Sequence, residues 1–343
     1  MTRAAKGRKG PSGPLAAHAG ARALAGKVAL VAGATRGAGR GIAASLGEAG
    51  AIVYCSGRST RAHPATGFYT GMPETIEETA ELVTASGGVG IPVRTDHLDR
   101  AQVAALVAKI GREQGHLDIL VNDISEGDIH EWKPFWKVDV ERGLAMFRNG
   151  VHTHILTSAL AVPLMLKPRA ASPGLIVEIT DGWGLGYHGS FFYDMVKTNV
   201  NRLAHVMAEE LHPRNIASLA ITPGYMRTEF VLKHHGVTER NWRDAAEKDA
   251  LFGESETPFF VGRAVVALAA DPAIMKKTGG LYSSWRLAEE YGFDDIDGRR
   301  PHLENRWARL YGENNSPMGP AKLPLTWAVI PAPEAKAPLS ELA

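Results

Sequence analysis

The chain has 343 residues, of which 45% are hydrophobic and 22% charged, and its formal net charge is +1. This balance is ordinary for a globular protein and excludes a strong overall field for binding nucleic acid or an anionic membrane. The single cysteine excludes an internal disulfide framework or cysteine zinc cluster and indicates a reducing, cytoplasmic setting, and no apolar run is long enough to predict a membrane span.

The two ends of the chain differ in composition from the part between them. The N-terminus is basic, and no acidic residue precedes Glu48. Because it lacks the continuous apolar stretch of a signal peptide, residues 1–24 are predicted to be a disordered basic tail, with a targeting peptide as the alternative. Residues 313–343 carry six prolines and are predicted to be a second, extended tail. The part between, 25–312, is predicted to be a single domain.

Within 25–312, short apolar runs typical of buried strands alternate with segments typical of helices. The predicted strands are 27–32, 51–57, 90–96, 117–123, 174–180, 216–224 and 279–284. The predicted helices are 41–50, 73–88, 101–115, 139–167, 193–211 and 257–271. This alternation predicts an α/β fold, a Rossmann-type doubly wound parallel sheet of about seven strands flanked by helices. Residues 228–256 are predicted to be a polar, mostly helical insertion suited to act as a lid, and 286–312 an appended segment.

A glycine-rich turn, Gly33-Ala-Thr-Arg-Gly37-Ala-Gly39, follows the first predicted strand and opens a helix. Glycines at this point let the backbone approach a pyrophosphate, and the helix N-terminus supplies N–H donors. We therefore predict a dinucleotide site that includes Thr35 of the turn. A lone glycine triplet is weak evidence, but the strand–turn–helix context strengthens it.

The second predicted strand ends without the acidic residue that NAD sites place on the ribose. It ends instead at Arg58 and Ser59, while Arg36 lies in the glycine turn. Guanidinium groups suit a 2′-phosphate because they offer a fixed fork of donors. The residues therefore favour NADP(H) over NAD(H), although two solvated surface arginines are the alternative reading.

Tyr193 and Lys197 lie four residues apart near the start of a predicted helix, so their side chains share one helical face. An ammonium beside a phenol is expected to lower the phenol pKa toward neutrality, which makes the tyrosine a proton donor or acceptor for a carbonyl/alcohol pair. Together with the GxxxGxG turn, this pair resembles the short-chain dehydrogenase/reductase family over about 26–285. The segment that begins at Ala270, and the loop 59–73, resemble the subgroup related to dehydrogenase/reductase member 1 and its bacterial relatives.

The resemblance implies further site residues and a role for the lysine. Lys197 would also hold the nicotinamide ribose. Further cofactor contacts implied by the family pattern are Asp96 at the adenine, Asn122 after the fourth strand, and the turn residues Pro223, Gly224 and Thr228.

The chain departs from the family pattern at two catalytic positions. An ungapped alignment places Asp181 where the family has its serine, whereas the usual spacing from Tyr193 points to Thr180. An ionised aspartate can only accept hydrogen bonds, so we expect Thr180 to orient the substrate oxygen and Asp181 to contact substrate or support the site. Gly150, beside Asn149, stands where the family has an asparagine.

Two further groups of residues were weighed. His152 and His154 do not share a helical face, so a metal site is not predicted, and His188 is a candidate lining residue of the substrate pocket. Aromatic residues gather in two loops at the carboxyl ends of the strands and favour an aromatic substrate, with loop packing or oligomer contacts as the alternative. These residues are Trp132, Phe135, Trp136, Trp183, Tyr187, Phe191 and Phe192.

The sequence therefore predicts an NADP(H)-dependent oxidoreductase that acts on a small carbonyl or alcohol, as a homo-oligomer without nucleic-acid or membrane partners. The alternative is an NADP(H)-binding protein with little or no turnover that serves a regulatory or scaffold role. The altered serine and asparagine positions favour this alternative, and the intact Tyr193 and Lys197 oppose it.

Overall fold

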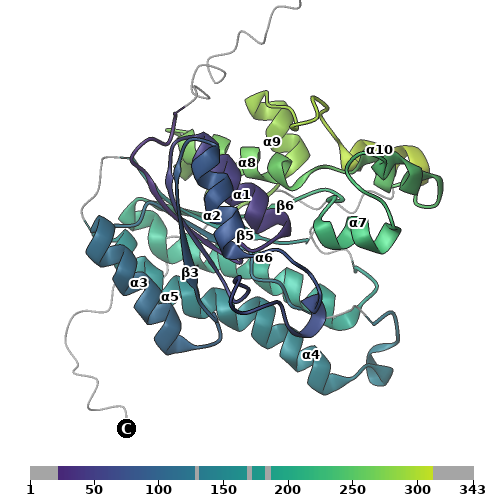
Figure 1. The fold of residues 1–343 in the computed structure, drawn as a ribbon, viewed down its shortest axis with the longest axis horizontal. Coiled ribbons are helices and arrows are strands. Elements are labelled where there is room, and N and C mark those ends of the chain that lie inside the picture. The colour runs from purple at the N-terminus through teal and green to yellow at the C-terminus, as the bar shows by residue number, and fades with distance from the viewer. Residues whose placement is uncertain (1–21, 128–130, 168–171, 182–186, 312–343) are drawn as a thin grey trace, which may run out of the picture.

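The computed structural model describes residues 22–127, 131–167, 172–181 and 187–311. These residues form a seven-stranded parallel sheet in the order β3-β2-β1-β4-β5-β6-β7, which confirms the predicted fold (Figure 1). The strands are β1 (Val28–Ala32), β2 (Ile52–Gly57), β3 (Val89–Arg94), β4 (Ile119–Asn122), β5 (Gly174–Ile179), β6 (Ile216–Thr222) and β7 (Leu281–Ser283).

Helices cover both faces of the sheet. Helices α1, α2 and α8 lie on one face, and α3, α5 and α6 lie on the other (Figure 1). The helices are α1 (Gly37–Glu48), α2 (Ile76–Ala85), α3 (Arg100–Gln114), α4 (Val140–Phe147), α5 (Thr153–Met165), α6 (Phe191–Leu211), α7 (Glu229–His235), α8 (Pro258–Ala270), α9 (Ser284–Tyr291) and α10 (Leu303–Tyr311). Strand order reverses between β1 and β4, and open α/β sheets bind ligands at such a point, beyond the carboxyl ends of the strands.

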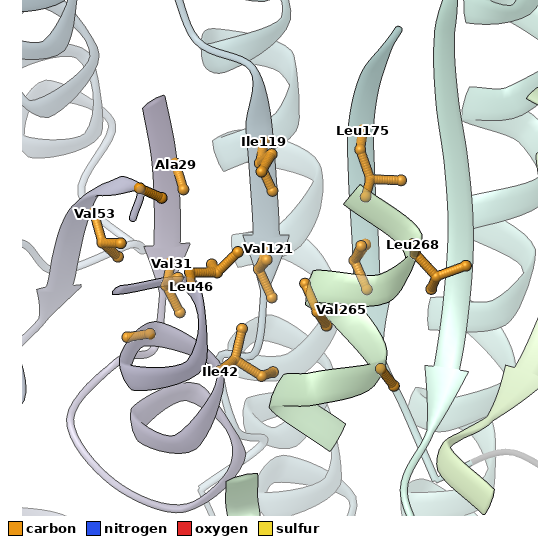
Figure 2. Close-up of a cluster of buried hydrophobic side chains, with 14 of the residues drawn as sticks. Ala29, Val31, Ile42, Leu46, Val53, Ile119, Val121, Leu175, Val265 and Leu268 are labelled. Atoms are coloured by element: carbon orange, nitrogen blue, oxygen red, sulfur yellow. The ribbon is translucent and has the colours of Figure 1, made fainter. Parts of the chain in front are cut away.

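The larger part of the core lies between the sheet and helices α1 and α8. Branched aliphatic side chains of β1, β4 and β5 meet Ile42 and Leu46 of α1 and Val265 and Leu268 of α8 (Figure 2). The two helices pack closely because a Cβ on Gly41 would lie 2.1 Å from the carbonyl oxygen of Pro258. This packing fixes the N-terminal end of α1, where the glycine turn lies.

The structure differs from the sequence expectations in two places. The predicted helix 139–167 is interrupted by a π-helical segment, Arg148–His152, between α4 and α5. Such segments recur at functional sites. Leu24, which the predicted boundary left in the N-terminal tail, is 1% exposed and packs in the core. Residues 22–23 of the predicted N-terminal tail are also described. All other residues of the two predicted tails lie outside the described ranges.

The insertion predicted at 228–256 contains α7 and two short 3-10 helices, Trp242–Glu247 and Phe252–Glu254. Its two ends are tied together, because Arg227 N–H donates to the Glu256 carbonyl (2.8 Å) and Glu256 N–H donates to the Tyr225 carbonyl (2.9 Å). The insertion is therefore anchored at its base, directly after the end of β6.

Candidate active site

The glycine turn between β1 and α1 has no room for side chains. Gly33 has φ of +95°, and a Cβ there would lie 2.3 Å from the Asp123 carbonyl oxygen. A Cβ on Gly39 would lie 2.4 Å from the Gly33 carbonyl oxygen. The turn therefore packs against the segment after β4 as only glycines permit.

Two carboxylates contact these first amides of α1. Glu229 of α7 accepts a hydrogen bond from Gly37 N–H at 2.8 Å, and Asp123 accepts one from Gly39 N–H. Burial raises the pKa of the Asp123 carboxyl to about 7, although Lys197 and the Gly39 N–H favour its charged form. Because the N–H groups at a helix N-terminus attract anions, as these two carboxylates illustrate, the same donor set fits a pyrophosphate.

The two arginines predicted to bind a 2′-phosphate differ in their surroundings. Arg36 Nε lies 3.2 Å from Glu74 Oε2, and its guanidinium stacks 4.6 Å from the centre of the Tyr69 ring. Arg58, at the end of β2, is exposed. Thr35 and Ser59, predicted beside these arginines in the sequence, are both buried. Glu74 therefore balances the charge of Arg36, whereas Arg58 faces solvent.

Asp96 and Asn122 are held by their neighbours rather than left open to solvent. Asp96 accepts a hydrogen bond from Leu98 N–H (3.0 Å). Asn122 is fully buried, and its Nδ2 donates to Ser158 Oγ (2.9 Å) and to Glu178 Oε1 (2.7 Å). Its Oδ1 has no hydrogen-bond partner within the described residues.

A buried polar network continues from Asn122 and was missed by sequence reasoning. Glu178 Oε2 lies 2.6 Å from His154 Nδ1, and His154 Nε2 lies 3.1 Å from the Ile124 carbonyl oxygen. The sequence signal was Glu178 itself, a charged residue inside the apolar strand β5. The network fixes the backbone between Asn122 and Glu126, which lines the site.

Tyr193 and Lys197 lie on one face of α6, as predicted, but their nearest charged partners are carboxylates. The Tyr193 hydroxyl donates a hydrogen bond to Asp181 Oδ2. Lys197 Nζ lies 3.1 Å from Glu126 Oε2 and 5.4 Å from the centre of the Tyr193 ring. Sequence reasoning missed Glu126, which follows the altered motif after β4 and carries no motif of its own.

The expected lowering of the tyrosine pKa is not observed. Burial raises the pKa of Tyr193 well above its usual range, and the charges of Asp181 and Glu126 raise it further. Burial lowers the pKa of Lys197, but Glu126 and Asp181 outweigh this, so the net pKa lies above its usual value. The prediction was wrong because it counted the ammonium but neither the burial of the phenol, which has the largest effect on its pKa, nor the two carboxylates beside it.

Thr180 and Asp181 make different contacts from those expected from the sequence. The Thr180 hydroxyl is buried and donates to the Lys197 carbonyl oxygen (3.1 Å), so it is engaged with the backbone of α6. Asp181 is the residue that meets the Tyr193 hydroxyl. In this structure the Thr180 hydroxyl thus bonds to α6, and Asp181 stands at the serine position of the ungapped alignment.

Gly150 lies in the π-helical segment with no space for a side chain. A Cβ there would lie 2.7 Å from Val196 Cγ1 and 3.3 Å from Glu126 Cβ. Its neighbour Asn149 donates from Nδ2 to the Glu126 carbonyl oxygen (3.1 Å). Asn149 therefore supports the residue that pairs with Lys197.

The turn after β6 is positioned by a buried glutamate. Gly224 N–H donates to the Glu256 carboxylate, and a Cβ on Gly224 would lie 2.7 Å from Glu256 Oε2. Burial raises the pKa of Glu256 to about 8. Thr228 caps α7 by accepting from Val231 N–H (3.2 Å), and Pro223 precedes Gly224 at the end of β6.

The predicted aromatic residues form partly exposed surfaces near α4 and α6. Trp132 and Trp136 are about 70% exposed, at 71% and 70%, and the ring centres of Phe135 and Phe191 lie 5.5 Å apart. Phe192 packs on α4, Tyr187 is exposed, and Trp183 lies outside the described residues. His188 contacts Asp194 Oδ1 through Nδ1 (2.7 Å), and its ring centre lies 6.0 Å from that of Tyr193.

Comparison with known proteins identifies the family. The family model described as short chain dehydrogenase matches residues 27–235. The chain belongs to the short-chain dehydrogenase family. The members of this family are oxidoreductases that use a nicotinamide cofactor and act on small molecules. This assignment confirms the resemblance seen in the sequence.

The relatives of this short-chain dehydrogenase agree with the predicted subgroup. The chain is 34% identical over 283 residues to dehydrogenase/reductase SDR family member 1 of Mus musculus, covering 80% of the chain and 85% of the relative. Among solved structures, a short chain dehydrogenase of Mycobacterium thermoresistibile matches with a TM-score of 0.66 at 24% identity, over 86% of this chain and 94% of that one. The Pseudomonas aeruginosa RhlG/NADP active-site complex matches with a TM-score of 0.62 at 23% identity, over 76% and 95%.

The described ranges contain neither a membrane-spanning helix nor a cluster of metal ligands. No helix there combines the length and apolarity needed to cross a membrane. In the same residues, no group of three or more His, Cys, Asp or Glu side chains is arranged to hold a metal ion. His154, one of the histidines weighed for metal binding, belongs instead to the buried network with Glu178, and His152 is exposed.

Proposed function

We propose that this short-chain dehydrogenase is an NADP(H)-dependent oxidoreductase that transfers a hydride between the nicotinamide and the carbon of a polar double bond, with a carbonyl and its alcohol as the reference pair. The observation that carries the proposal is the placement of Tyr193 and Lys197 on one face of α6, beside the segment that packs on the glycine turn. The bound cofactor would supply or accept the hydride.

The residues of the glycine turn fit the phosphates of such a cofactor. Gly37 and Gly39 offer N–H donors at the N-terminus of α1, where carboxylates lie in this structure. Arg58 and Arg36 support binding of a 2′-phosphate, and the exposed Arg58 is the better placed of the two. Asp96, Asn122 and the turn from Pro223 to Thr228 would complete the contacts, as the family pattern implies.

Tyr193 would act as the acid/base and Lys197 would hold the nicotinamide ribose. The raised pKa of Tyr193 keeps its phenol protonated near neutral pH, so it can give a proton to a substrate oxygen that gains negative charge. Asp181 would hold the phenol in place through their hydrogen bond.

The alternative is an NADP(H)-binding protein without turnover, and one observation favours it. Asp181 offers no donor to a substrate oxygen when ionised, and the family serine that would do so is absent. Tyr193→Phe separates the two functions. If the protein is an enzyme, the variant loses NADPH oxidation with ketones, quinones and aldehydes while its NADPH affinity, measured by fluorescence titration, is retained. Unchanged turnover in the variant would refute the assigned role of Tyr193.

A further inference from the structure

Among the described residues, the charged side chains nearest the Tyr193 hydroxyl are mostly carboxylates. Asp181 accepts the hydroxyl hydrogen bond, and Glu126 pairs with Lys197 at 3.1 Å. Asp123 adds a third carboxyl group, close enough to shift the pKa of Lys197. Within the described ranges, the Lys197 ammonium therefore faces three carboxyl groups, of which Asp181 is the one in contact with the acid/base tyrosine.

A neutral ketone is poorly matched to this arrangement. As its carbon receives a hydride, negative charge develops on its oxygen, and that oxygen needs hydrogen-bond donors. An ionised carboxylate accepts hydrogen bonds only, so Asp181 would oppose the developing charge. A cationic C=N group is better matched to Asp181. Its N–H donates a hydrogen bond to the carboxylate, and its positive charge is attracted to the carboxylate's negative charge.

We infer that the preferred substrate of this site is an iminium ion, a protonated C=N group, and that Asp181 binds its N–H. The inference rests on the proposed hydride transfer and narrows its substrate class. The substrate carbon receives the hydride with its electron pair, and the C=N π pair becomes the nitrogen lone pair of a neutral amine. The positive charge of the substrate ends on the oxidised nicotinamide, so charge and electrons balance.

Reduction of an iminium ion does not depend on the acidity of Tyr193. An iminium ion already carries its proton, so its reduction requires no proton donation in the hydride step. Tyr193 then serves to hold the Asp181 carboxylate through their hydrogen bond.

The activity test compares two probes that share a bicyclic ring skeleton, 3,4-dihydroisoquinoline as the iminium and 1-tetralone as the ketone. With the full chain and NADPH, we expect kcat/KM at least tenfold higher for dihydroisoquinoline. Asp181→Ser replaces the carboxylate with a hydroxyl donor and should reverse this preference. The control is Glu81→Gln, which removes an exposed carboxylate on α2 that pairs with Arg61. It should leave the ratio of the two kcat/KM values unchanged.

A binding test gives a second readout that needs neither cofactor nor turnover. Calorimetry should show that 1,2,3,4-tetrahydroisoquinolinium binds at least tenfold more tightly than its neutral oxygen analogue isochroman. Asp181→Asn, which keeps the side-chain shape and removes its charge, should abolish this difference while NADPH affinity reports an intact fold.

The outcomes separate this inference from the function on which it rests. Reduction of 1-tetralone in preference to dihydroisoquinoline, with no ammonium preference in binding, would overturn the inference and leave hydride transfer intact. If the ammonium preference depends on Asp181 but no carbonyl or iminium probe oxidises NADPH, the proposed function fails while the binding role of Asp181 stands.

Discussion

The Glu229 carboxylate lies 2.8 Å from the backbone nitrogen of Gly37 and accepts its hydrogen bond, although 192 residues separate the two. Glu229 begins α7, inside the insertion predicted to act as a lid, and Gly37 begins α1. The donor that the glycine turn offers to a pyrophosphate is thus engaged by the insertion. A cofactor bound as proposed would therefore compete with the insertion for one N–H group.

Glu229→Gln should therefore increase the affinity for NADPH. A negative charge at a helix N-terminus is worth about 0.3–1 kcal/mol, so removing this competitor should tighten binding about two- to fivefold. NADPH fluorescence titration measures the effect. Glu247→Gln, at an exposed position of the same insertion, is the matched control and should not change the affinity. Weaker binding by the Glu229 variant would show that the carboxylate assists the cofactor.

Cofactor affinity should fall as pH rises above about 7, because of Asp123. Its pKa is about 7 without cofactor, set by burial and by the surrounding Gly39 N–H, Lys197, His154 and Glu126. A pyrophosphate on the same helix N-terminus raises this pKa further, so above pH 7 binding must take up a proton. The dissociation constant should then rise by up to about tenfold per pH unit.

Asp123→Asn tests this pH dependence. The asparagine does not titrate, so the variant should show a flatter plot of log Kd against pH between pH 7 and 8.5, measured by NADPH fluorescence. Parallel titrations with NADH remove any contribution from the 2′-phosphate. Equal slopes in the variant and the natural chain would exclude Asp123 as the titrating group.

Arg58→Ala should weaken NADPH far more than NADH. Arg58 is exposed at the end of β2, whereas Arg36 is already paired with Glu74, so Arg58 should carry most of the contact with the 2′-phosphate. Losing one charge-assisted contact is worth about 1.5–3 kcal/mol, or roughly ten- to a hundredfold in Kd. Titration with both cofactors provides the comparison, and equal weakening would refute the assignment.

The folded protein should lose stability as pH falls below about 6.5, in part because of His97. This buried imidazole contacts Ser56 Oγ (2.9 Å) and Thr157 Oγ1 (2.8 Å). Burial lowers its pKa to about 3, helped by the charges of His154 and Arg58. Between pH 6.5 and 3 the unfolded chain binds the proton and the folded chain does not, so this contribution is fully present above pH 6.5 and declines by at most about 1.4 kcal/mol per pH unit below it.

His97→Gln keeps a polar group at this position and removes the titration. Urea unfolding at pH 7.5 and 5.5 should show a smaller loss of unfolding free energy for the variant than for the natural chain. An equal loss in both proteins would assign the acid sensitivity to other groups.

The sequence predicts the parts of this protein that depend on local pattern. The seven strands of the parallel sheet were confirmed, and Tyr193 and Lys197 do lie on one helix, because periodicity and i, i+4 spacing are properties of neighbouring residues. Glu126 and Glu229 were not anticipated, because their roles depend on which distant segments the fold brings together. The predicted lowering of the Tyr193 pKa was wrong for the same reason, because the burial and the carboxylates that raise this pKa are set by the fold.

The choice between Thr180 and Asp181 shows where sequence reasoning reaches its limit. The two residues are adjacent at the end of β5, where successive side chains point to opposite sides. A shift of one position in the alignment therefore exchanges a residue bound to the α6 backbone for one that contacts Tyr193. Counting along the chain cannot resolve such a shift, whereas the register of β5 in the sheet does.

The contact between Gly150 and Val196 limits how this site can evolve. The β carbon of an asparagine at position 150 would lie 2.7 Å from Cγ1 of the stiff, β-branched Val196, closer than carbon atoms pack. A side chain at position 150 therefore requires a smaller residue at position 196, at a cost to the packing of α6. The two positions are coupled, so a single substitution at position 150 cannot supply the family asparagine without disturbing the helix that carries Tyr193.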